Sequence, residues 1–267
     1  ILARDIAGEK PLYYGFVNKN NTKSFIFGSQ LSCLSKHINW NSEISKKSLE
    51  NFLNFGFIPG EDSIYENIKK IKPGSYMCIN ILNSKILFYK KWYKNNRIEV
   101  NSKYDFEYFK SKLKKKLTST VIESSVSDVP LGAHLSGGID STLVCSILAK
   151  NNIKFETFTI GYNENDYDES EYAEKISSFL NIKNNKLIIN NNDLIGTVEK
   201  LAYVYDEPFA DSSQIPSTIL SNYASKRVKV MLTGDGADEL FGGYNRHVYL
   251  KKILKMDLAK KNIFKFL

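Results

Sequence analysis

One short run constrains this 267-residue chain more than any other feature. Residues 135–142 read Leu-Ser-Gly-Gly-Ile-Asp-Ser-Thr and join an apolar stretch, 129–135, to a segment with helical spacing, 141–150. Adjacent glycines let a backbone approach a ligand closely, and the first N–H groups of the following helix point at the same place. The run therefore predicts a strand, a tight turn and a helix that together bind phosphate oxygens.

The polar residues of this loop refine the prediction. Ser136 and Ser141 add hydroxyl donors, whereas Asp140 would repel a bare phosphate and so implies a magnesium ion between carboxylate and phosphates. No Gly-Lys-Ser/Thr follows at the spacing of a Walker-type loop. A serine–glycine turn alone is a weak signal, but the full pattern between a strand and a helix is a strong signal for a phosphate site.

A second glycine-rich turn is strongly acidic. Residues 232–244 read Leu-Thr-Gly-Asp-Gly-Ala-Asp-Glu-Leu-Phe-Gly-Gly-Tyr, which places Asp235, Asp238 and Glu239 close together. Their mutual repulsion is unfavourable unless a cation lies nearby, although a helix-capping aspartate in a surface turn is the alternative. Taken with the first loop, the pattern predicts that Asp140 and Asp238 hold one magnesium ion from two sides.

A third acidic run is open to two interpretations. Residues 205–213 read Tyr-Asp-Glu-Pro-Phe-Ala-Asp-Ser-Ser, and Asp206 and Glu207 precede a proline at a helix end. Asp211 or Ser212 could simply cap the next helix, and this interpretation is as well supported as a functional one.

Strand and helix patterns alternate from residue 105 onward. Such alternation predicts a doubly wound parallel sheet with helices on both faces, in which ligands bind beyond the carboxyl ends of the strands. Both glycine-rich turns fall at such ends. The predicted strands are 129–135, 155–162, 186–190 and 228–232, and the predicted helices are 106–127, 141–150, 169–180, 193–205 and 212–226.

Residues 1–92 show a different residue pattern. Short β-like runs lie at 11–17, 24–28, 75–81 and 86–92, and helical patterns lie at 31–37 and 48–55. This pattern predicts an α+β layered domain. The polar stretch 93–104 is interpreted as a linker, and 105–267 as the second domain.

Composition limits the class of protein. The formal charge of +8 comes from scattered lysines, and the denser runs 110–116 and 251–261 have helical spacing, so we expect solvated helix faces and no nucleic-acid partner. No run is long and apolar enough to span a membrane, and no signal peptide is recognisable. Cys33, Cys78 and Cys145 are interpreted as buried reduced thiols of a cytoplasmic protein. The ends at Ile1 and Leu267 suggest a piece of a longer protein.

Together these motifs resemble glutamine-dependent asparagine synthetases and related amidotransferases. The resemblance rests on Ala-Arg-Asp at 3–5 followed by Lys-Pro-Leu-Tyr-Tyr at 10–14, on Lys-Pro-Gly at 72–74, on Asp-Glu-Pro at 206–208 and on the two loops. It implies that 1–92 is the C-terminal part of a glutaminase domain and that 105–267 is an incomplete ATP pyrophosphatase-type synthetase domain. Gln30 departs from the family, which usually has glutamate there.

The resemblance also implies roles for individual residues. Asp5 would hold the α-amino group of glutamine, and Asp235 would face the incoming ammonia or acceptor as the catalytic residue. Asp140 and Asp238 would ligate Mg²⁺. The residues implied to bind ATP are His134 (through its backbone), Ser136, Gly137, Gly138, Asp140, Ser141, Ile160, Thr233 and Gly234. The family's N-terminal nucleophilic cysteine and a downstream catalytic lysine have no counterpart among these residues.

The implied reaction is amidation of a carboxylate through an acyl-adenylate, with ATP and Mg²⁺ as cofactors, ammonia from glutamine, and aspartate as the expected acceptor. Three alternatives stay open: another carboxylate such as a sugar uronic acid or a peptide, or ring closure as in β-lactam synthetase; a tRNA-modifying ATP pyrophosphatase; and a non-enzymatic nucleotide-binding remnant. A homodimer is compatible with the resemblance, but the sequence does not determine the oligomeric state.

Overall fold

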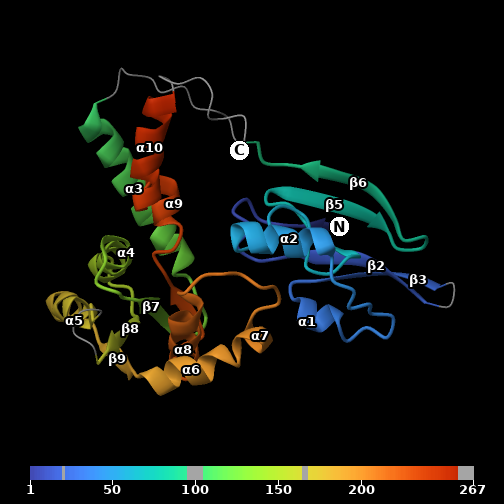
Figure 1. The fold of residues 1–267 in the computed structure, drawn as a ribbon. Coiled ribbons are helices and arrows are strands. Elements are labelled where there is room, and N and C mark those ends of the chain that lie inside the picture. Colours follow the sequence, from blue (N-terminus) through green and yellow to red (C-terminus); the bar gives the residue numbers. More distant parts are fainter. Residues whose placement is uncertain (20–21, 95–104, 164–167, 258–267) are drawn as a thin grey trace. The chain divides into compact units, whose positions relative to one another are not determined.

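The computed structural model describes residues 1–19, 22–94, 105–163 and 168–257 (Figure 1). Contacts divide the chain into two compact units. The N-terminal unit is Ile1–Asn101 with Ile195–Ile215, and the C-terminal unit is Ser102–Leu194 with Pro216–Leu267. Most of the predicted linker, residues 95–104, lies outside the described residues.

The N-terminal unit contains two antiparallel three-stranded sheets, in the orders β3-β2-β4 and β1-β5-β6. The hairpin β2–β3 pairs Tyr13 with Gly28. The strands are β1 (Leu2–Ala3), β2 (Tyr13–Lys19), β3 (Thr22–Gly28), β4 (Ile68–Lys70), β5 (Ser75–Asn80) and β6 (Lys85–Lys91), and the helices are α1 (Leu31–Leu34), α2 (Lys46–Phe55) and α7 (Leu201–Val204). The layered α+β arrangement predicted for this part of the chain is therefore present.

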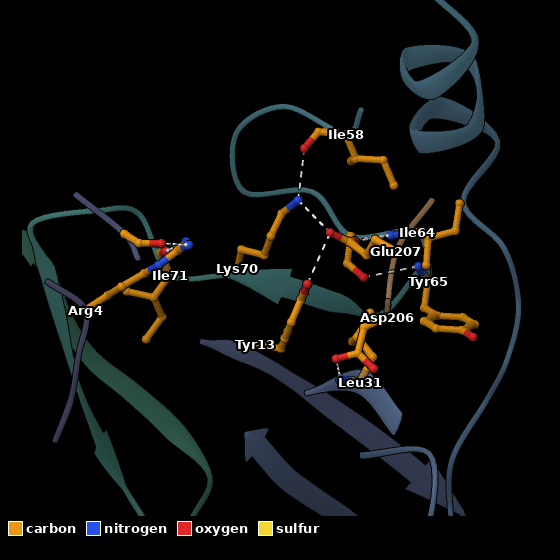
Figure 2. Close-up of polar contacts among 12 residues, drawn as sticks. Arg4, Tyr13, Leu31, Ile58, Ile64, Tyr65, Lys70, Ile71, Asp206 and Glu207 are labelled. Atoms are coloured by element: carbon orange, nitrogen blue, oxygen red, sulfur yellow. Dashed lines mark hydrogen bonds and ion pairs between the residues drawn. The ribbon is translucent and has the colours of Figure 1, made fainter. Parts of the chain in front are cut away.

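The loop that follows β1 is held by one arginine. The Arg4 guanidinium donates to the backbone carbonyls of Lys10 at 2.9 Å, Ile71 at 2.8 Å and Gly8 at 2.7 Å; Figure 2 shows the contact with Ile71. Hydrogen bonds from a charged donor are stronger than neutral ones. Arg4 therefore fixes the loop that presents its neighbour Asp5.

The C-terminal unit contains a parallel four-stranded sheet in the order β10-β7-β8-β9. The strands are β7 (Leu131–His134), β8 (Glu156–Tyr162), β9 (Asn184–Ile189) and β10 (Val230–Leu232). The helices are α3 (Phe106–Ser124), α4 (Ile139–Lys150), α5 (Ser170–Phe179), α8 (Gln214–Ser225), α9 (Ala237–Phe241) and α10 (Asn245–Asp257), and α6 (Asn191–Val198) crosses the division between the units.

Helices cover both faces of this sheet, as predicted (Figure 1). Ala133 and Leu135 pack with Cys145 of α4 and Ala173 of α5. Successive strand residues point to opposite faces, and Phe158 packs on the other face against residues of α8. The doubly wound architecture predicted from the alternating pattern is confirmed.

Several local predictions need correction. The helix predicted at 193–205 is instead two short helices, α6 and α7, with the break at residues 199–200. Gly196, inside α6, lowers the helix propensity of this stretch. Strand β4 was not predicted, because three residues are too few for a periodic pattern. Cys145 is buried, but Cys78 is only half-buried and Cys33 is exposed, so the prediction of buried thiols is wrong for Cys33.

The structure also bears on the predictions for the two lysine-rich runs and for membrane-spanning segments. Lysines of the run 110–116 are exposed on α3, which confirms a solvated helix face. Of the second run, residues 258–261 lie outside the described residues. Among the helices that the structure describes, none combines the length and the apolar character that crossing a membrane requires.

Candidate functional site

The first predicted loop connects β7 to α4 in the C-terminal unit. The two serine hydroxyls of this loop lie 2.9 Å apart, and Ser141 Oγ donates to the Gly138 carbonyl at 3.2 Å. Gly137 has a left-handed φ of +88°, which favours glycine. Gly138 is the N-cap of α4, and no side chain caps this helix end. The first N–H groups of α4 are thus available to an anion, and helix termini of this kind bind phosphate.

The second predicted turn meets the first. Strand β10 pairs in parallel with β7, so the loops after both strands lie at the same edge of the sheet. A Cβ atom built on Gly234 would lie 2.9 Å from the backbone nitrogen of Ser141 and 3.0 Å from Cβ of Asp140. Such distances are too short for a real Cβ atom. The fold therefore brings two distant sequence motifs into direct contact, and only glycine at position 234 allows it.

The acidic side chains at this edge come from both loops. Asp140 lies in the first turn of α4 and Asp238 in the first turn of α9. Asp235 accepts a hydrogen bond from the Thr233 hydroxyl at 3.0 Å. The described ion pairs include none of these three carboxylates. Their charge is thus left for a ligand or a cation to balance.

The donor set is compatible with magnesium. Within the described part of the chain, no group of three or more His, Cys, Asp or Glu residues could form a complete metal cage. Magnesium is usually bound through one or two carboxylates, several waters and substrate phosphates. Asp140 and Asp238 beside the uncapped N-terminus of α4 fit that pattern, and they remain predicted ligands.

His134 lies at the carboxyl end of β7. It pairs in register with Phe158 of β8, so it shares a sheet face with Phe158 and with Ile160, two residues further on. Burial lowers the pKa of His134 below its ordinary value, and the negative charge of Asp235 opposes the shift. The two residues predicted to line the adenine pocket thus share one face, and Asp235 lies within electrostatic reach of His134.

The pKa of His134 predicts a pH dependence of stability. In the unfolded chain a histidine titrates near about pH 6.5, whereas the folded His134 resists protonation. As the pH falls through this range the unfolded state binds more protons, so the free energy of unfolding should decrease. Urea denaturation at about pH 7.5 and about pH 5.5 measures this change. The free energy of unfolding should fall less between the two pH values for His134→Gln than for the parent chain. An unchanged decrease in His134→Gln would contradict the assignment of this pH dependence to His134.

Asp5 lies in the N-terminal unit and is exposed. Its Oδ1 accepts from the N–H groups of Gly8 at 2.6 Å and Glu9 at 3.1 Å. Burial opposes ionisation, but the backbone donors, led by Glu9 and Gly8, outweigh it and hold the pKa of Asp5 below its usual value. The carboxylate is therefore ionised and shapes the loop, and its binding of an α-amino group stays a prediction.

The third acidic run has a mixed outcome. Asp211 accepts from the N–H of Ser213 at 2.8 Å in the turn just before α8, and the capping interpretation stays a prediction. Asp206 instead accepts from the Leu31 N–H of α1, and Glu207 pairs with Lys70 of β4 (Figure 2). The partner Lys70 was not singled out from the sequence, because no local pattern links two positions so far apart.

A large hollow of the C-terminal unit lies elsewhere. It measures about 1390 Å³ and runs along α3 and α4 between apolar and lysine side chains. Its described lining includes no residue of the runs 135–142 or 232–244. The junction of the two loops is therefore separate from this hollow.

Comparison with known proteins identifies the family. Residues 112–263 match the model of the asparagine synthase family, which is more than half of the chain. This chain belongs to the asparagine synthase family. Residues 1–93 match the glutamine amidotransferase domain. The family resemblance inferred from the motifs is thus confirmed.

Relatives in the asparagine synthase family are longer than this chain. Asparagine synthetase [glutamine-hydrolyzing] 1 of Bacillus subtilis is 33% identical over 91% of the chain and 37% of its own length. Putative asparagine synthetase [glutamine-hydrolyzing] 2 of Methanocaldococcus jannaschii is 34% identical over 97% of the chain and 49% of its own length. The chain therefore spans less than half of the length of these two relatives.

Similarity to solved structures is more distant. The glutamine-dependent NAD+ synthetase of Acinetobacter baumannii, solved with ADP, is 14% identical with a TM-score of 0.37, over 86% of this chain and 52% of that chain. NMN synthetase of Francisella tularensis is 18% identical with a TM-score of 0.36, over 53% of this chain and 59% of that chain.

Proposed function

We propose that this chain is part of a ligase that uses ATP to convert a carboxylate into an amide, with aspartate as the acceptor and glutamine as the source of ammonia. The observation that carries the proposal is the contact between Gly234 and the Asp140–Ser141 backbone at the N-terminus of α4. It joins a phosphate-binding helix end to an acidic turn in a member of the asparagine synthase family.

The chemistry follows from the groups at this edge. A carboxylate is a poor electrophile, so its oxygen first attacks the α-phosphorus of ATP, and the bond from this phosphorus to the bridging oxygen breaks. Pyrophosphate leaves with its charge stabilised by the N–H groups of α4 and the Ser136 hydroxyl. Asp140 and Asp238 would hold magnesium, which neutralises phosphate charge when bound.

The second step uses the product of the first. Ammonia attacks the acyl carbon of the adenylate, the bond to the AMP oxygen breaks, and a proton is released from the nitrogen. Asp235, which is exposed beside Thr233, is proposed to receive that proton or orient the ammonia. Ile160, Thr233 and the His134 backbone would contact the adenosine part, and Asp5 would bind the glutamine amino group.

The products test the reaction class and the acceptor. The whole protein is supplied with Mg-ATP, ammonium chloride and one carboxylate at a time: aspartate, a sugar uronic acid, or a short peptide. We expect AMP and pyrophosphate in equal amounts with one amide, and aspartate as the best acceptor. Formation of ADP and phosphate would contradict the adenylate, and amidation of the uronic acid or peptide alone would assign a different acceptor.

A further inference from the structure

The segment 195–215 matches the synthetase family model by sequence but packs within the N-terminal unit in the structure. Residues 195–215 lie inside the stretch that matches the asparagine synthase model, 112–263, but they pack within the N-terminal unit. The remainder of that unit, through residue 93, matches the glutamine amidotransferase domain. The packing of this segment therefore fastens synthetase-type sequence to the glutaminase-type unit.

Asp206 makes the first attachment. Its Oδ2 accepts from the Leu31 N–H at 2.8 Å, and its Oδ1 accepts from the Ser32 N–H at 3.0 Å (Figure 2 shows the contact with Leu31). Gln30, the N-cap residue of α1, makes no side-chain capping bond. A carboxylate from a distant segment thus satisfies N–H groups that the local sequence leaves open.

Glu207 makes the second attachment, in a largely buried position. Its Oε2 lies 2.9 Å from Nζ of Lys70 and accepts from the Tyr13 hydroxyl at 3.3 Å, and its Oε1 accepts from the Ile64 N–H at 2.9 Å. The side chains of Lys70 and Glu207 are 12% and 14% exposed. Lys70 also donates to the Ile58 carbonyl at 2.9 Å. Figure 2 shows these contacts converging on the one carboxylate.

Tyr13 keeps its hydroxyl proton in this network. Burial and the negative charge of Glu207 raise the pKa of Tyr13 above its ordinary value, so the hydroxyl stays protonated and donates a hydrogen bond to Glu207.

Ala210 makes the third attachment, because its N–H donates to the Gly56 carbonyl at 2.6 Å. Three points of attachment within five residues hold the segment in a defined position.

The attached segment also forms a wall of a hollow. The hollow measures about 780 Å³, and its lining combines Tyr13, Gln30 and Ile58 with Glu207 and Phe209 of the attached segment. Loss of the attachment would open this wall.

The Lys70–Glu207 pair is largely buried. Removing one partner of such a pair leaves the other charge buried without a partner, whereas removing both leaves no buried charge.

We propose that Lys70, Glu207 and Tyr13 form a latch that couples glutamine hydrolysis to amide formation, with Glu207 as its central positioning residue. The inference rests on the proposed function. Closure of the latch holds the synthetase-type segment on the glutaminase-type unit while both reactions run. Opening it leaves each reaction intact but lets glutamine-derived ammonia be lost.

A double-mutant cycle in the whole protein tests the latch. Glu207→Gln and Lys70→Met are made singly and together, with Lys47→Met as the matched control, since the Lys47–Asp62 pair is an exposed ion pair of the same unit. We expect each single variant to lower the amide formed per glutamine hydrolysed by about tenfold, a typical coupling effect. Ammonia-dependent synthesis should stay within about twofold, and the double variant should recover most of the ratio.

Amide hydrogen exchange provides an independent readout of the latch. The amides of Ile64 and Leu31 should exchange faster in Lys70→Met than in the parent or in Lys47→Met, because their acceptors lie on the released segment. If exchange accelerates but the ratio of amide to glutamate is unchanged, the network is only structural and the coupling role is overturned. If the parent protein makes no amide from any carboxylate or ammonia, the proposed function fails instead, while the exchange data still report the attachment.

Discussion

Asp140→Asn should reduce acceptor-dependent pyrophosphate release by about a hundredfold or more in the whole protein, as should Asp238→Asn. Each amide keeps the size of the side chain but removes the negative charge that a magnesium ion requires. The two carboxylates lie in the first turns of α4 and α9, which follow the two loops in contact at Gly234. Release is measured with Mg-ATP, ammonium and the acceptor at saturating concentrations.

The matched control is Glu171→Gln. Glu171 is an exposed acidic residue in the first turn of α5, so it shares the helix position of Asp140 but belongs to neither loop. Its variant should retain the parent rate within about twofold, since an exposed charge in a first helical turn is worth only a few tenths of a kcal/mol to about 1 kcal/mol. Normal release by either aspartate variant would refute its assignment as a metal ligand.

Gly234→Ala should lower the same rate by about a hundredfold, the cost of displacing reacting groups by a distance of about 1 Å. The added Cβ would meet the Ser141 nitrogen at 2.9 Å and the Asp140 carbonyl carbon at 3.0 Å. These are backbone atoms, so one loop has to move away from the other. The binding of Mg-ATP, measured by calorimetry, should weaken in parallel.

The Gly196→Ala variant separates this effect from a general sensitivity to alanine. A Cβ on Gly196 meets nothing within 4 Å, and the residue lies inside α6. Alanine there should raise stability by up to about 1 kcal/mol, because glycine is a poor helix former. Thermal unfolding monitored by circular dichroism should show both variants folded. Unchanged ATP affinity in Gly234→Ala would mean that the two loops do not form one nucleotide site.

Local signals explain why much of the C-terminal unit could be predicted. Strand β7 lies in the apolar stretch 129–135, and β8 is rich in β-branched and aromatic residues. The glycines at 137 and 138 mark the turn between β7 and α4. A right-handed strand–helix–strand unit then follows from general rules. Weaker signals failed: β4 has three residues, and the apolar pattern across 193–205 does not show the break between α6 and α7 at residues 199–200.

The sequence by itself determined the parallel sheet, the glycine turn before α4 and the family, because each depends on residues that are neighbours along the chain. Only the tertiary structure decided that Gly234 touches Asp140 and that Glu207 pairs with Lys70. Hydrogen bonds and ion pairs between distant segments leave no periodic trace in a single sequence. They depend on where the fold carries each backbone, and a buried carboxylate is stable only where the fold also supplies its donors.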